Sequence, residues 1–207
     1  MESRIETSRL VIRTMDEHNM MDLLGVFGIL GDEDTAWWAD VEPFEDLEDA
    51  YGMIHWGNTN KRGITQYAVC DKESNFILGL LQVKASRIPN VSIAELGYAM
   101  CDKARGKGYM TEAVKAVCEK LFEDPTMTEV RCEILPFNDP SKGVAHRCGF
   151  TKVEQKWCEK EKRELDDNLL DEYVLSANDY RKRVAGFDYS YLSVIEKEED
   201  LYEQLAA

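Results

Sequence analysis

The chain has few histidines and no pattern of metal-binding cysteines. The three histidines, at positions 18, 55 and 146, are not spaced like metal ligands, so we expect no metal site. The six cysteines are scattered without a Cys-x-x-Cys pair and lie mostly inside apolar runs. Both absences favour reduced thiols packed in a core over a metal or disulfide framework.

Long apolar segments are also absent. No run reaches the length of a membrane span, and the first residues, Met1-Glu2-Ser3-Arg4, form no apolar signal region. We therefore expect a cytoplasmic protein with no membrane partner. The 207 residues, 44% of them apolar, are enough for one domain with a sizeable core, with or without an appendage.

Positive charge is scarce. Lys and Arg number 25 against 40 Asp and Glu, which gives a net charge of −15. This excess argues against nucleic acid as a partner, because phosphates would be repelled. It is compatible with a cationic amine substrate, since an acidic surface attracts amines. General solubility of a cytosolic protein is the simpler explanation.

One glycine-containing segment, Arg105-Gly106-Lys107-Gly108, lies between two patterned stretches. The apolar run Ile93–Met100 before it is typical of a strand, and a helical pattern follows it. Two glycines and the first turn of a helix can direct several backbone N–H groups at one anion, and two cations are nearby. The segment is not a dinucleotide-binding fingerprint, because Thr111 stands where that motif needs its third glycine. The alternative to an anion site is an ordinary strand-to-helix loop. The apolar face of the expected helix consists of Met110, Ala113, Val114, Val117, Leu121 and Phe122.

Three separated segments form recognisable motifs. They are Arg105-Gly106-Lys107-Gly108-Tyr109 with Thr111-Glu112-Ala113, the opening Glu6-Thr7-Ser8-Arg9-Leu10 with Arg13, and Asn138-x-x-Ser141 followed by Gly149-Phe150. Together they resemble the GNAT N-acetyltransferases, and among them the ribosomal-protein N-terminal acetyltransferases. Lys103 stands where the family's glycine loop begins with Gln or Arg, a departure of small effect because this loop binds through backbone N–H groups.

The resemblance implies an α+β fold with α/β/α layers. Its sheet is mixed but mostly antiparallel, with about seven strands flanked by helices, and is splayed between the fourth and fifth strands. We expect the acetyltransferase domain at residues 5–180 and a C-terminal helical appendage at 181–207, for packing or homodimer contact. Periodicity predicts an irregular acidic stretch at Gly31–Glu45, helices at about 16–27, 47–60, 109–122 and 140–148, and strands at 5–13, 66–70, 76–85, 91–100, 129–135, 151–157 and 169–176.

The function that the resemblance implies is acetyl-CoA-dependent N-acetylation. An acetyl group would move from the CoA thioester to a primary amine, a protein N-terminus or a small-molecule amine, by direct attack. The alternative is a non-catalytic acyl-CoA-binding sensor or interaction domain on the same fold.

Glu95 is the candidate general base. It is a carboxylate inside an apolar strand that should be mostly buried, and burial makes a carboxylate more basic. A structural carboxylate paired with an arginine is the alternative. Ser141 is the candidate that hydrogen-bonds the departing thiolate, with helix capping as its alternative. Glu112 is a weaker candidate base, since the family commonly uses it to support the cofactor helix.

The expected cofactor contacts follow from the same resemblance. Backbone N–H groups of Tyr98, Ala99 and Met100 would serve the oxyanion, and Asn138 with Ser141 would meet the pantetheine arm. Three tryptophans at 37, 38 and 56 line the acceptor pocket or only pack in the core. The pyrophosphate loop is expected to use Arg105, Gly106, Lys107, Gly108, Tyr109 and Met110.

Overall fold

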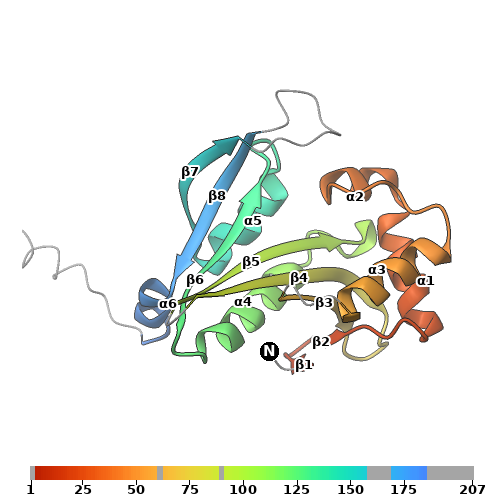
Figure 1. Ribbon diagram of the computed structural model, residues 1–207, viewed down its shortest axis with the longest axis horizontal. Coiled ribbons are helices and arrows are strands. Elements are labelled where there is room, and N and C mark those ends of the chain that lie inside the picture. The colour runs from red at the N-terminus through yellow and green to blue at the C-terminus, as the bar shows by residue number, and fades with distance from the viewer. Residues whose placement is uncertain (1–2, 60–62, 89–90, 158–168, 186–207) are drawn as a thin grey trace, which may run out of the picture.

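A computed structural model describes residues 3–59, 63–88, 91–157 and 169–185 of the chain. They form one eight-stranded sheet with helices on both faces (Figure 1), in the order β1-β2-β3-β4-β5-β6-β8-β7. The strands are β1 (Arg4–Glu6), β2 (Leu10–Thr14), β3 (Ile64–Asp71), β4 (Ile77–Ile88), β5 (Val91–Met100), β6 (Met127–Ile134), β7 (Thr151–Trp157) and β8 (Leu169–Ser176). The α-helices are α1 (Met20–Leu30), α2 (Glu33–Trp38), α3 (Leu47–Thr59), α4 (Tyr109–Phe122), α5 (Asp139–Cys148) and α6 (Ala177–Val184). The predicted mixed α+β fold is confirmed.

The sheet has one strand more than the predicted seven, because the segment predicted as the first strand forms two strands, β1 and β2. A tight turn separates β1 from β2: the Thr7 N–H donates to the Leu10 carbonyl at 2.9 Å, and the Leu10 N–H donates to Thr7 Oγ1 at 2.9 Å. A single strand over residues 5–13 was therefore wrong, since a side-chain hydroxyl replaces a ladder partner there. The predicted splay consequently falls between β5 and β6.

The segment predicted to be irregular contains α2. Asp32 caps this helix, with its Oδ2 accepting from the Thr35 N–H at 2.9 Å and from Thr35 Oγ1 at 2.6 Å. Six residues are too few to show a helical period in the sequence, so only the cap could have signalled the helix. The first predicted helix also begins later, at Met20, because Asn19 is its N-cap.

The two faces of the sheet are buried by different helices. On one face, the apolar side of α4 packs against alternate strand residues such as Leu10 and Ile12, and every residue predicted for that side is buried. On the other face, α1 and α3 cover Val11, Ala68 and Leu80. Burial on both faces explains why β2 and β3 read as continuous apolar runs.

The parallel strands β5 and β6 pair only over a short stretch. Their register runs from Ser92 to Glu95 on β5, and beyond Glu95 the two strands separate while β5 stays paired with β4 up to Met100. The backbone of the last residues of β5 therefore faces a gap on its β6 side. This gap is the predicted splay, and it lies at the end of the sheet where α2 and α5 approach (Figure 1).

The last described helix, α6, packs on the domain. The Tyr180 ring stacks on Phe122 of α4 with centroids 4.7 Å apart, so the predicted boundary at residue 180 falls inside a packed helix. The predicted amphipathic helix of the tail lies outside the described residues. Within the described ranges, no helix is long and apolar enough to cross a membrane.

Candidate active site

Two cavities meet at the splay. The larger, about 720 Å³, extends along the start of α4 and the start of α5, and the smaller, about 310 Å³, lies between β4, β5 and β6. Side chains or backbone that line both cavities mark their junction, and these residues are Trp38, Ala39, Tyr98, Ala99, Asn138 and Ser141. A molecule in one cavity can therefore touch a molecule in the other.

The predicted glycine loop forms one end of the larger cavity. Gly106 and Gly108 have φ angles of +75° and +78°, a region that side chains disfavour. Gly108 is the N-cap of α4 and has no side chain to accept the first-turn N–H groups. The start of α4 therefore presents unsatisfied donors and a positive dipole end at this cavity.

Two predicted loop cations lie differently from expectation. Arg105 lines the larger cavity, but its guanidinium donates to Thr35 Oγ1 of α2 at 2.6 Å and to the Met100 carbonyl at 3.2 Å. The same group forms an ion pair with Asp34 at 3.4 Å, so it also ties the loop to α2. Lys107 is not among the lining residues.

The cavities differ in charge. Among the residues that the structure describes, the smaller one is lined by three carboxylates, Asp40, Glu95 and Glu133, and by no Lys, Arg or His. The larger one is lined by Arg105 and Arg147, with a single carboxylate, Asp139. The larger cavity suits an anionic ligand and the smaller a cationic one.

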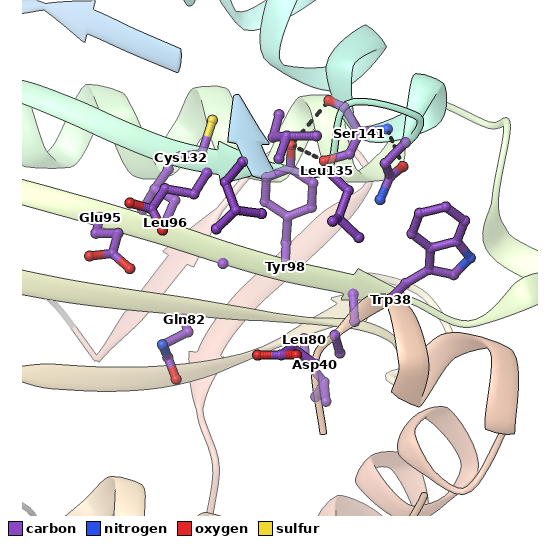
Figure 2. Close-up of a pocket in the computed structure, with 17 residues that line it drawn as sticks. Trp38, Asp40, Leu80, Gln82, Glu95, Leu96, Tyr98, Cys132, Leu135 and Ser141 are labelled. Atoms are coloured by element: carbon purple, nitrogen blue, oxygen red, sulfur yellow. Dashed lines mark hydrogen bonds between the residues drawn. The ribbon is translucent and has the colours of Figure 1, made fainter. Parts of the chain in front are cut away.

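A hydrogen-bonded hydroxyl pair stands at the junction. Ser141 Oγ donates to the Tyr98 hydroxyl at 3.0 Å, and that hydroxyl donates to the Ser141 carbonyl at 3.2 Å; Figure 2 shows the two side chains facing one another. Burial raises the pKa of Tyr98 well above its usual range, so the phenol remains protonated. The cap of α5 is Asn138, whose Oδ1 accepts from the Ser141 N–H at 3.1 Å, so the capping alternative for the serine hydroxyl is wrong.

Glu95 lines the smaller cavity, but it is not buried. Its side chain is 44% exposed and forms an ion pair with Lys84 Nζ at 3.1 Å. The cause is the register of the β4–β5 hairpin, which places Lys84 directly opposite Glu95 on one face of the sheet. The expectation of a buried, lone carboxylate was therefore wrong, whereas Glu95 does line the smaller cavity (Figure 2), and its role as a base stays a prediction.

Of the tryptophans at 37, 38 and 56, only Trp38 lines the cavities. Its ring meets Phe137, at the end of the loop after β6, with centroids 5.8 Å apart, and Trp37 stacks edge-on against Trp38 at 4.7 Å. This cluster connects α2 to the loop before α5, beside the gap between β5 and β6. Trp56 lies on α3 and is 44% exposed, so it is not core packing.

Three lining groups were missed in the sequence: Asp40, Glu133 and the Tyr98 hydroxyl. Asp40 follows Trp38 in an acidic stretch, and its φ of +60° is unusual for a residue with a side chain. Glu133 and Tyr98 are inconspicuous polar positions on strands. Tyr98 and Glu133 reach one cavity because β5 diverges from β6, and Asp40 reaches the same cavity from the end of α2. No local signal in the sequence identifies these three groups.

A splayed sheet with a helix N-terminus at one cavity and a second, acidic cavity beside it offers two adjoining ligand sites, an arrangement suited to the transfer of a group between two bound molecules. Residues 9–151 match the family model described as acetyltransferase (GNAT) domain, and the chain belongs to this family. It is an acetyl-CoA-dependent N-acetyltransferase, as the sequence predicted.

Similar proteins have several acceptors in their names. The [ribosomal protein uS5]-alanine N-acetyltransferase of Escherichia coli is 25% identical over 158 residues, covering 72% of this chain and 78% of that protein. Spermidine N-acetyltransferase of Vibrio cholerae, solved with CoA and spermine, superposes with a TM-score of 0.70 at 14% identity over 84% of this chain and 99% of that one. RimL, a ribosomal L7/L12 alpha-N-protein acetyltransferase solved with CoA, superposes with a TM-score of 0.68 at 19% identity over 85% of this chain and 99% of that one.

Proposed function

We propose that the larger cavity holds acetyl-CoA, that the smaller holds a cationic primary amine, and that the acetyl group passes between them beside Tyr98 and Ser141. The observation that carries this proposal is the junction: two cavities of opposite charge share one wall. Among the described residues, only those at the junction line both cavities.

The larger cavity fits the cofactor in charge and in donors. Gly106 and Gly108 would let backbone N–H groups approach the pyrophosphate, and the first turn of α4 adds the positive dipole end. Arg105 and Arg147 supply positive charge at the lining. The side-chain amide nitrogen of Asn138 has no hydrogen-bond partner among the described residues, and it would bind the pantetheine amides. Bound acetyl-CoA supplies the acetyl thioester.

Residues at the junction and in the smaller cavity would accept and donate the protons of the reaction. Glu95 would accept the proton of the amine through a water, because its carboxylate is half-exposed at the acceptor cavity. The open β6 side of β5 leaves the backbone N–H of Tyr98, which points away from β4, to donate to the developing oxyanion. The Ser141 hydroxyl, which donates to the Tyr98 oxygen in the free protein, would turn to donate to the departing sulfur. The Tyr98 hydroxyl would then turn from the Ser141 carbonyl to donate to Ser141 Oγ. Because Tyr98 holds its proton tightly, this relay works by hydrogen bonding.

Removing either hydroxyl should slow turnover without weakening cofactor binding. Ser141→Ala and Tyr98→Phe should each lower kcat by about tenfold, the value of one hydrogen bond that forms in the transition state. The double variant should lose little more than either single one, because the two groups act as a unit. Steady-state kinetics with calorimetric CoA affinity would measure this. Additive losses, or a loss confined to thermal stability, would contradict the relay.

The acceptor is expected to carry more than one positive charge. A panel of peptides with free N-termini, polyamines and aminoglycosides, assayed by thiol release from acetyl-CoA, should give the highest kcat/KM with acceptors of two or more charges. Asp40→Asn and Glu133→Gln should raise KM for the best acceptor about fivefold each, with kcat little changed. The effect should shrink at high salt.

A matched control is Glu119→Gln, which removes an exposed carboxylate of α4 that lines neither cavity. It should leave the acceptor KM unchanged. Equal KM increases in all three variants would mean that overall charge, and not the cavity, attracts the amine. A wild-type enzyme that prefers singly charged or neutral-tailed amines would overturn the assignment of the acceptor class.

A further inference from the structure

The turn between β1 and β2 lies against the start of α4, although about 100 residues separate them in sequence. Glu112 in the first turns of α4 accepts hydrogen bonds from the Thr7 hydroxyl at 2.6 Å, the Ser8 hydroxyl at 3.1 Å and the Arg9 backbone N–H at 3.1 Å. Burial alone would raise the pKa of Glu112, but these bonds and the one from the Arg9 side chain outweigh it and lower the pKa. The carboxylate is therefore a fixed anion at neutral pH.

The Arg9 guanidinium is held on three sides. Its Nε donates to Glu112 Oε2 at 2.7 Å, and its Nη2 forms an ion pair with the same oxygen at 2.6 Å. Its plane lies over the Tyr109 ring, 4.6 Å from the centroid. Its Nη1 donates to the Lys107 carbonyl at 3.1 Å. An arginine bound in this way has little rotational freedom, so its contact with the loop is directional.

The bond to the Lys107 carbonyl fixes the orientation of one peptide unit. In a planar trans peptide, the carbonyl of Lys107 and the N–H of Gly108 point in opposite directions. The described chain has no cis peptide. Arg9 lies on the outer side of the loop and lines neither cavity, whereas Gly108 lines the larger one. Holding the carbonyl outward therefore directs the Gly108 N–H toward the cavity.

We infer that Arg9 is a positioning residue for cofactor binding: it never touches the cofactor, and it locks the 107–108 peptide so that the glycine loop presents its N–H groups to the pyrophosphate. Without Arg9, two glycines with positive φ would leave the loop free to rotate this peptide. Binding would then have to order the loop and would be weaker. The inference rests on the proposed position of acetyl-CoA in the larger cavity.

The test compares two acetyl donors. S-acetylpantetheine carries the same thioester as acetyl-CoA but no pyrophosphate. Arg9→Ala should lower kcat/KM for acetyl-CoA about tenfold and weaken calorimetric CoA binding by a similar factor, while kcat/KM for S-acetylpantetheine stays within about twofold. Arg9→Lys should recover only part of the loss, since an ammonium cannot bind Glu112 and the Lys107 carbonyl in the same geometry or stack on Tyr109. Arg4→Ala, an exposed arginine of the same hairpin, is the control and should match wild type.

Glu112→Gln separates positioning from direct contact. If Arg9 acts because Glu112 holds it, this variant should also weaken CoA binding, and the double variant should be no worse than Arg9→Ala. If Arg9 instead reaches the phosphates directly, releasing it from Glu112 should leave CoA binding unchanged or tighter, which would overturn the inference. Equal losses with both donors would show a general structural role and would overturn it too. Wild-type protein that fails to bind CoA would refute the proposed function itself, a result distinct from these.

Discussion

Replacing Gly108 with valine is expected to abolish the stabilisation that acetyl-CoA gives the protein. At a ligand concentration about 100 times the dissociation constant, wild type should gain about 2.7 kcal/mol in unfolding free energy. Gly108 has a φ of +78°, which a β-branched residue avoids, and it lines the larger cavity, where we propose that acetyl-CoA binds. Valine would therefore rotate the loop or fill the space for the phosphates. Thermal unfolding with and without acetyl-CoA measures the difference.

The control for this variant is Gly28→Ala. Gly28 lies within α1, and a Cβ there would meet nothing within 4 Å, so the change should be neutral or slightly stabilising. It should keep the full ligand response. Gly108→Val would also strain the backbone and lower the stability of the free protein by about 1–3 kcal/mol. The informative quantity is therefore the ligand-induced shift in Tm and not the absolute Tm. A shift of wild-type size in Gly108→Val would show that the loop does not bind the cofactor.

Glu95→Gln is expected to lower kcat/KM for the best amine by about 10², the lower end of the range for a general base. The lower end applies because the carboxylate is half-exposed and forms an ion pair with Lys84 Nζ at 3.1 Å. The deficit should shrink toward high pH, since an amine with a pKa of about 10.4 is then already largely neutral. Profiles of kcat/KM against pH for both proteins would measure it.

Lys84→Met distinguishes catalysis from structure at this position. If Glu95 only pairs with Lys84, removing either partner should have the same small effect, as exposed ion pairs contribute little. If Glu95 accepts the proton, Lys84→Met should keep most of the activity, because the carboxylate remains at the cavity. Identical pH profiles for wild type and Glu95→Gln would exclude Glu95 as the base and direct attention to Glu133.

The sequence by itself determined the features that depend on neighbouring residues. The glycines at 106 and 108 indicated a sharp loop between a strand and a helix, and in the structure both adopt the positive φ that glycine allows. The 3.6-residue period after Gly108 identified the buried side of α4, and Asn138 with Gly149 marked the two ends of α5. These predictions succeeded because caps, periods and backbone angles are decided within one turn of chain.

The tertiary structure alone decided how distant segments face one another. The register of β4 against β5 placed Lys84 beside Glu95 and exposed a carboxylate that an apolar strand seemed to bury. The short pairing of β5 with β6 opened the gap in which Tyr98 meets Ser141. The contact of Arg9 with the glycine loop depends on the packing of a hairpin turn on α4. Such contacts are set by the sum of many pairings across the sheet, so no local pattern in the sequence contains them.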